Sequence, residues 1–132
     1  DEKSALPRVC IVALGSMVPA ALESAVLLED EGKATVRVVD PRWALPVPEA
    51  LVSLAEGADL VLSVEDGLVD GGFGWSLRDL LSARDETLNV RVVSAGIPKK
   101  FLDQASRVSI VSALNLDAEG LAATLRRELA LK

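Results

Sequence analysis

The amino-acid sequence predicts an α/β fold, a three-layer α/β/α domain with helices on both faces of a mainly parallel sheet. Four short apolar runs alternate with helical patterns, and short loops join them. Hydrophobic residues make up 50% of the 132 residues and aromatic residues only 3%, so Val, Leu, Ala and Ile must form the core. Strands that are buried on both faces have this composition. Alternating units form right-handed β-α-β crossovers, for which the most natural strand order is 2-1-3-4.

The first unit consists of an apolar strand at Val9–Leu14 and a helix that ends before Gly32. Ser16 is the predicted cap of this helix, and Pro19 is tolerated in its first turn. The residues expected to face the sheet are Val18, Leu22, Ala25 and Val26. Cys10 lies inside the strand, which favours a buried structural thiol over a reactive one.

Three more strands and four more helices follow. The expected strands are Thr35–Val39, Leu60–Glu65 and Val90–Val93, the last leading to Ala95-Gly96. The expected helices between them are Glu49–Glu56 and Gly72–Ala83. Ser106 is the predicted cap of a short helix that ends near Asn115. Asp117 is the predicted cap of the last helix, whose inward residues are Leu121, Leu125 and Leu129.

A candidate site follows from this strand order. The switch point of a 2-1-3-4 sheet lies between the first and third strands, and clefts form there outside the carboxyl ends. Gly15-Ser16 and Glu65-Asp66 end these two strands, so we expect them to be neighbours. A glycine-rich turn overlooks the same point. The candidate interface or cleft residues are Ser16, Glu65, Asp66, Gly71, Gly72, Phe73 and Gly74.

The chemistry of these residues has two interpretations. The amides of the glycine-rich turn open a helix and can hold an anion, although a tight turn that needs positive φ is the preferred explanation. Adjacent Glu65 and Asp66 project to opposite faces of a strand and cannot work as a facing carboxylate pair. One of them could act as a general acid or base, but we favour capping of nearby amides.

Three further features of the sequence lie outside this turn. Lys99 and Lys100 could meet a phosphate, yet such a pair is more often simply solvated. Trp43 and Trp75 are interpreted as packing or interface residues. The chain begins with Asp1 rather than methionine, so we expect it to be a processed protein or part of a longer one.

Composition excludes several classes of function. The chain has no histidine, which rules out Ser-His-Asp and Cys-His catalysis, and its single cysteine argues against a zinc site. The first strand-to-helix turn has only one glycine, so it lacks the dinucleotide-binding fingerprint, and no Walker sequence occurs. The net charge of −6 argues against nucleic acid or an anionic membrane as partner. A lone cysteine is consistent with a reducing cytoplasm.

The order of motifs resembles the C-terminal domain of the transketolase superfamily of thiamine diphosphate enzymes. The segments that carry the resemblance are Val12–Val18, Val38–Trp43, Val64–Gly67 and Gly71–Gly74. Gly96–Phe101, followed by Ala105-Ser106-Arg107, is similar to 1-deoxy-D-xylulose-5-phosphate synthases. Asp40–Pro46 is similar to the actinobacterial form of that family. Lys99-Lys100 departs from the more usual pair at its position, which contains an acidic residue.

The resemblance implies that residues 1–132 are one domain of a larger enzyme. It also implies an additional antiparallel edge strand, for which only Asp1–Arg8 remain. The whole enzyme would join pyruvate to glyceraldehyde 3-phosphate with release of carbon dioxide, using thiamine diphosphate and Mg²⁺ held elsewhere. Glu65-Asp66-Gly67 is not the family's Gly-Asp-Gly motif, and neither Asn89 nor Asn115 completes it.

The expected role of the chain is therefore structural. The resemblance implies no catalytic, cofactor-binding or metal-binding residue in it, and an inactive isolated chain. Its partners would be the catalytic domains of the same polypeptide and a second copy in a homodimer. Two alternatives stay open: a free-standing module that binds an anion or small ligand, and the C-terminal domain of a related 2-oxoacid dehydrogenase subunit.

Overall fold

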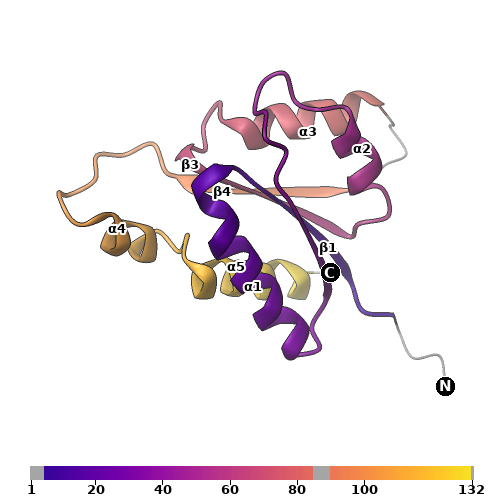
Figure 1. Ribbon diagram of the computed structural model, residues 1–132, viewed down its shortest axis with the longest axis horizontal. Helices are drawn as coiled ribbons and strands as arrows, with labels where there is room; N and C mark the ends of the chain where they lie inside the picture. Colours follow the sequence, from indigo (N-terminus) through magenta and orange to yellow (C-terminus); the bar gives the residue numbers. More distant parts are fainter. Residues whose placement is uncertain (1–4, 85–89, 132) are drawn as a thin grey trace.

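A computed structural model describes residues 5–84 and 90–131 and contains one four-stranded sheet (Figure 1). Its strands are β1 (Arg8–Ala13), β2 (Thr35–Val39), β3 (Leu60–Leu68) and β4 (Arg91–Ile97). They pair in the order β2-β1-β3-β4, and every pair is parallel. The predicted fold class and strand order are confirmed. The described residues include no antiparallel strand, and Asp1–Ser4 of the segment expected to form one lie outside them.

Helices cover both faces of the sheet. The helices are α1 (Val18–Asp30), α2 (Ala50–Ala55), α3 (Phe73–Arg84), α4 (Arg107–Ala113) and α5 (Ala118–Ala130), with a short 3₁₀ turn, η1 (Gly15–Met17), before α1. In Figure 1, α2 and α3 lie above the sheet and α1 and α5 below it. Alternate strand residues therefore enter two separate cores. Ile11 and Leu62 pack with α1 and α5, whereas Val12 and Val61 pack with α2 and α3.

Two expectations for α1 were wrong. Ser16 does not cap the helix: the N-cap is Met17, which provides no side-chain hydrogen bond. Leu22 and Val26 do not face the sheet but are 52% and 56% exposed. The buried residues of α1 are Ala21, Ser24, Ala25 and Leu28. Most of these buried residues are small, so the helix packs close to the strands. A pattern of large apolar residues does not identify this face of the helix.

Strands β3 and β4 both extend beyond the predicted ends. Their pairing is shifted between Val64 and Leu68, and it resumes where Leu68 pairs with Ile97. The amide of Val69 then donates to the carbonyl oxygen of Ile97 at 2.9 Å. We call this register shift the bulge, and such irregularities re-aim the residues within them. Glu65, the predicted last residue of the third strand, consequently lies inside the extended strand.

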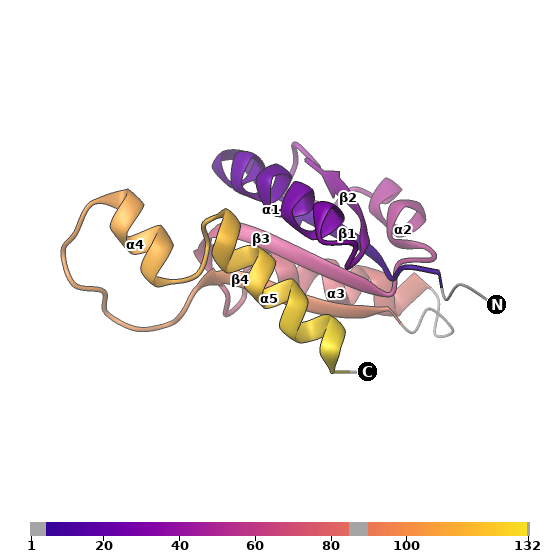
Figure 2. The ribbon, with the colours of Figure 1, turned by 90° about the horizontal axis from the view of Figure 1, so that it is seen from below.

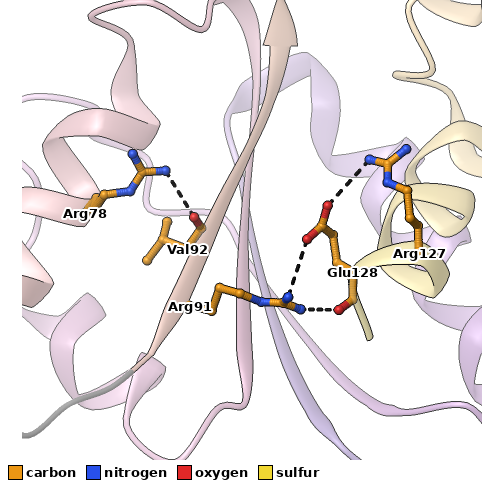
Figure 3. Close-up of polar contacts among 5 residues, drawn as sticks. All are labelled: Arg78, Arg91, Val92, Arg127 and Glu128. Carbon is orange, nitrogen blue, oxygen red and sulfur yellow. Dashed lines mark hydrogen bonds and ion pairs between the residues drawn. The ribbon is translucent and has the colours of Figure 1, made fainter. Parts of the chain in front are cut away.

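Arginine side chains tie the edge strand β4 to both helical layers (Figure 3). Arg78 of α3 donates to the carbonyl oxygen of Val92 at 3.0 Å. On the other side, Arg91 lies 3.6 Å from the Glu128 carboxylate of α5 and also donates to the carbonyl oxygen of Glu128. Such contacts use backbone and side-chain groups that an exposed sheet edge would otherwise offer to another chain.

The stretch Arg107–Ala130 has the length and mean hydropathy, 1.2, of a membrane span. It is not one continuous helix, because Asn115 adopts a φ of 57° between α4 and α5. Asp117 caps α5 by accepting from the amide of Gly120 at 2.8 Å, as the sequence predicts. Leu121 and Leu125 of α5 are fully buried in the core. The stretch therefore consists of two helices of the folded domain, the second packed on the sheet.

An ion pair between Arg126 of α5 and Glu31, which follows α1, predicts a pH dependence. Arg126 Nε donates to Glu31 Oε2 at 2.9 Å, and this hydrogen bond lowers the pKa of the Glu31 carboxyl. A lowered folded-state pKa gives stability that is present above the ordinary pKa and lost as the pH falls through the folded value. Urea unfolding is measured as the pH falls from above the ordinary carboxyl pKa to below the folded-state value. The free energy of unfolding should fall less over this range in Glu31→Gln than in the parent chain. Equal losses would contradict the expectation.

Candidate functional site

Three polar side chains meet at the carboxyl edge of the sheet. Asp66 in β3 accepts from Ser16 of η1 at 3.5 Å and from Arg107, the first residue of α4, at 2.7 Å. Arg107 also donates to the Ser16 hydroxyl at 3.2 Å. The predicted proximity of Ser16 to Glu65-Asp66 is thereby confirmed for Asp66. The Arg107 and Asp66 side chains are 56% and 43% exposed, so the pair stabilises the fold by about 1 kcal/mol at most.

Arg107 was not among the predicted site residues. Its local sequence carries part of the family resemblance and signals the start of a helix, because Ser106 precedes it and accepts from the amide of Ser109 at 3.2 Å, but neither feature indicates a partner for Arg107. The pairing joins residues 41 positions apart in the chain, Arg107 and Asp66. An exposed acid and an exposed arginine have many alternative partners, and no spacing rule selects this one. The bare sequence therefore gave no signal for the pair.

Glu65 points into the domain instead of the cleft and is only 8% exposed. Its Oε2 accepts from the amide of Phe73 at 3.0 Å, and its Oε1 accepts from the amide of Gly74 at 3.4 Å. The anion held by the start of α3 is therefore a carboxylate of the chain itself. Of the two interpretations of Glu65, amide capping is the one that the geometry supports.

Each of the three glycines in the turn is required for a different structural reason. Gly71 adopts a φ of +69°, a backbone conformation that the tight turn requires and that glycine adopts readily. The space around its Cβ position is open. Gly72 has no room for a side chain, because a methyl group there would overlap the Leu68 carbonyl oxygen and the Glu65 carboxylate. Gly74 lies directly on the sheet. A methyl group there would overlap two serine hydroxyls, those of Ser63 and Ser94.

Phe73, the remaining predicted site residue, belongs to the core. It is 5% exposed and packs in the cluster that α2 and α3 form with the sheet. Beneath the neighbouring Gly74 lie Ser63 and Ser94, paired across β3 and β4. Their buried hydroxyls have no hydrogen-bond partner among the described residues. The turn is therefore fitted tightly to the sheet, and only Ser16 and Asp66 of the candidate residues discussed so far offer side-chain atoms to a partner.

Several exposed apolar side chains belong to the same end of the sheet as this polar network, or to the segments that follow it in the chain. They lie at or after the carboxyl ends of β2, β3 and β4, and they are Trp43 (71% exposed), Leu68 (50%), Phe101 (fully exposed) and Val108 (79%). Trp75, in the first turn of α3, is 48% exposed. Lys99 and Lys100 are exposed as well, which agrees with a solvated pair. We call this set of residues together with Ser16, Asp66 and Arg107 the carboxyl-edge face.

Part of this face belongs to a projecting arm, residues 98–116. Figures 1 and 2 show α4 and its connecting segments extending away from the sheet. No residue of α4 is buried, and residues 99–109 are all exposed. The arm returns to the domain at Leu116, which is 3% exposed in the core. Apart from the Arg107 contacts, most of the arm gains little from packing on its own domain.

The carboxyl-edge face has polar and apolar groups suited to docking. In residues 5–84 and 90–131, no group of three or more His, Cys, Asp or Glu side chains is placed to hold a metal ion. The described cysteine, Cys10, is buried on the α2 and α3 side of the sheet. Exposed aromatic and aliphatic groups beside a satisfied charge network are typical of protein interfaces.

Comparisons with known proteins agree on one family. The family model described as "Transketolase, C-terminal domain" matches residues 2–121. The chain is 41% identical over 119 residues to 1-deoxy-D-xylulose-5-phosphate synthase of Corynebacterium glutamicum (strain R), covering 90% of this chain and 18% of that protein. It is 43% identical over 114 residues to the Rhodococcus jostii (strain RHA1) synthase, covering 86% of this chain and 17% of that protein. The chain thus spans less than a fifth of these relatives.

A solved structure agrees with these sequence matches. It is described as "Split gene transketolase, inactive beta4 tetramer" and superposes with a TM-score of 0.79. Sequence identity is 33%, over 95% of this chain and 39% of that one. The similarity therefore extends across nearly all of the fold described above.

Proposed function

The chain belongs to the transketolase C-terminal domain family, and on that premise we propose that residues 1–132 are the C-terminal domain of a thiamine diphosphate-dependent 1-deoxy-D-xylulose-5-phosphate synthase. The observation that carries this proposal is the match to synthases at 41–43% identity over 86–90% of the chain. The whole enzyme condenses pyruvate with glyceraldehyde 3-phosphate and releases carbon dioxide, in the cytoplasm. Its product serves the synthesis of isoprenoid and thiamine precursors.

Within that enzyme, we propose that the carboxyl-edge face docks on the catalytic domains and helps to hold a homodimer. The relatives are more than five times longer than the segment that they share with this chain, so the remainder of the same polypeptide is available as the occupant. Exposed Phe101 and Val108 supply apolar area, and the Asp66–Arg107 pair supplies polar contacts. Burying a fully exposed aromatic side chain such as Phe101 contributes about 1.5–3 kcal/mol.

Neither Glu65 nor Asp66 fits a Mg²⁺ site, because each carboxylate already has partners within the chain. Both oxygens of Glu65 accept from amides of α3, and Asp66 is paired with Arg107. Thiamine diphosphate and Mg²⁺ supply the carbanion chemistry of such a synthase, and we propose that other domains of the polypeptide hold them. The contribution of this chain is to position those domains. The isolated chain is accordingly expected to form no product.

A chimera tests the function. The matching segment of the Corynebacterium glutamicum synthase is replaced by this chain, and formation of 1-deoxy-D-xylulose 5-phosphate from pyruvate and glyceraldehyde 3-phosphate is measured. We expect an active, dimeric chimera and no product from the isolated chain. A folded chimera that dimerises but has no activity would overturn the assignment to a synthase.

The docking role has a separate test within that chimera. Phe101→Asp places a charge on the carboxyl-edge face at a fully exposed position, so the fold of the chain itself should be unaffected. We expect activity or dimer affinity to fall by about tenfold or more, as for an aromatic hot spot. Leu131→Asp is the matched control, because Leu131 is 63% exposed and follows α5 at the end of the chain. Equal behaviour of the two variants would contradict docking through this face.

A further inference from the structure

A cavity lined by polar and apolar residues lies at the opposite end of the sheet from the carboxyl-edge face. It has a volume of about 210 Å³ and is bounded by the first residues of β1 and β2 and by the turn that follows α2. Arg8 and Cys10 of β1 line it, together with Arg37 of β2. Gly57 and Ala58 form the side opposite the strands. The proposed synthase role uses none of these residues.

The strand register places both guanidinium groups on one face. Arg8 and Cys10 are two residues apart in β1 and therefore project to the same side of the sheet. Arg37 pairs directly with Cys10 across the strands, so its side chain projects to that side too. This is the α2 and α3 side, because Cys10 packs in that core. The two arginines thus lie diagonally across neighbouring strands at the mouth of one cavity.

Backbone contacts position both side chains. Nη1 of Arg37 donates to the carbonyl oxygen of Leu54 at 3.3 Å. The guanidinium of Arg8 lies against Gly57, with both terminal nitrogens 3.0 Å from the point where a Cβ would be. Gly57 also adopts a φ of +74°, so a side chain there is disfavoured twice. Arg37 is therefore anchored by one of its donors while the others stay available, and the Arg8 guanidinium lies beside the turn that follows α2. Pre-organised donors bind with a smaller entropic cost.

The side chains that line the cavity include more positive than negative groups. Among the described residues, neither Arg8 nor Arg37 forms an ion pair with a carboxylate. Glu56 lines the cavity, and the nearby Asp59 carboxylate accepts from the backbone amide of Arg8 at 2.7 Å. Burial raises the pKa of the Cys10 thiol, although Arg37 acts in the opposite direction, so the thiol stays neutral at neutral pH. Two guanidinium groups therefore line the cavity together with a single carboxylate.

We propose that this cavity is a binding site for a small phosphate-bearing anion. Guanidinium groups bind phosphate oxygens through two parallel hydrogen bonds, and two arginines offer a fork to each side of one phosphate group. The volume accommodates one phosphate group with a small organic substituent. Inorganic phosphate and a phosphate ester share this chemistry, so the test includes both.

Titration of the ¹⁵N-labelled 132-residue chain, followed by NMR at constant ionic strength, tests the site. The ligands are inorganic phosphate and glycerol 3-phosphate. We expect saturable shifts confined to amides at the start of β1 and β2 and in the turn after α2. Arg37→Gln should weaken binding by about ten- to a hundredfold, because it removes charge-assisted hydrogen bonds. Tighter binding of the ester assigns the site to esters, and equal or tighter binding of phosphate assigns it to the free ion.

Two further variants control for charge and folding. Arg127→Gln removes one positive charge from α5, on the other face of the sheet, and should leave the affinity unchanged. Among the described residues, Glu56 is the one carboxylate that lines the cavity, so Glu56→Gln should tighten binding. The spectrum of each variant reports its fold, and Arg8→Gln repeats the test if Arg37→Gln is misfolded. Shifts that do not saturate, or equal weakening by Arg37→Gln and Arg127→Gln, would overturn the proposal.

Discussion

Replacement of Glu65 by alanine is expected to lower the free energy of unfolding by about 2–4 kcal/mol. The Glu65 carboxylate accepts from the amides of Phe73 and Gly74 at the start of α3, and it does so at 8% exposure. Without it, two buried donors lose their acceptor, and the positive end of the helix dipole loses a neighbouring charge. Urea denaturation of the 132-residue chain measures the loss.

Two matched variants separate this cause from a general effect of mutation. Glu65→Gln keeps an oxygen that accepts from α3 but removes the charge, so its loss should be smaller than that of Glu65→Ala. Asp66→Ala removes the adjacent carboxylate, which is 43% exposed and paired with Arg107. The expected loss there is about 1 kcal/mol or less. If Asp66→Ala destabilised the chain as much as Glu65→Ala, the capping role of Glu65 would be refuted.

The sequence predicted those parts of the fold that depend on local pattern. Continuous apolar runs identify buried parallel strands, and β2 begins and ends at the predicted residues, Thr35 and Val39. The caps Ser106 and Asp117 were also correct, because a cap acts within three residues of its own position. The start of β3 at Leu60 was predicted as well, but its carboxyl end was not predictable in the same way. Its last residues pair with β4 after a bulge, and that pairing is set by tertiary contacts.

The candidate site was predicted only as a location. The strand order brings Ser16 and Asp66 together, and this follows from the topology alone. The opposite roles of Glu65 and Asp66 follow from their adjacent positions, yet which one is buried depends on the bulge. Arg107 reaches the site from a projecting arm, for which the sequence has no spacing signal. Small residues such as Ala21 also escaped the pattern, because close packing rather than hydrophobicity selects them.

Replacement of Gly72 by alanine should cost about 3 kcal/mol or more, at the upper end of the range for overpacking. The added methyl group would overlap the carbonyl oxygen of Leu68, a backbone atom in β3, and the Glu65 carboxylate. The backbone oxygen belongs to a paired strand and cannot move without disturbing the bulge. Displacement of Glu65 would in turn remove the acceptor of the α3 amides. Both routes of relief are therefore costly, and thermal or urea unfolding of Gly72→Ala measures the result.

The neighbouring glycine provides the control for this prediction. Gly71 requires a φ of +69° but has nothing within 4 Å of its Cβ position. Asparagine tolerates this backbone conformation better than other residues with a side chain, so Gly71→Asn should cost about 1 kcal/mol or less. Gly72→Ala thus measures the cost of insufficient space for a side chain, whereas Gly71→Asn measures the cost of the backbone conformation in the same turn. A small loss in Gly72→Ala would mean that β3 yields at the bulge, and the tight fit of α3 on the sheet would then not be required for stability.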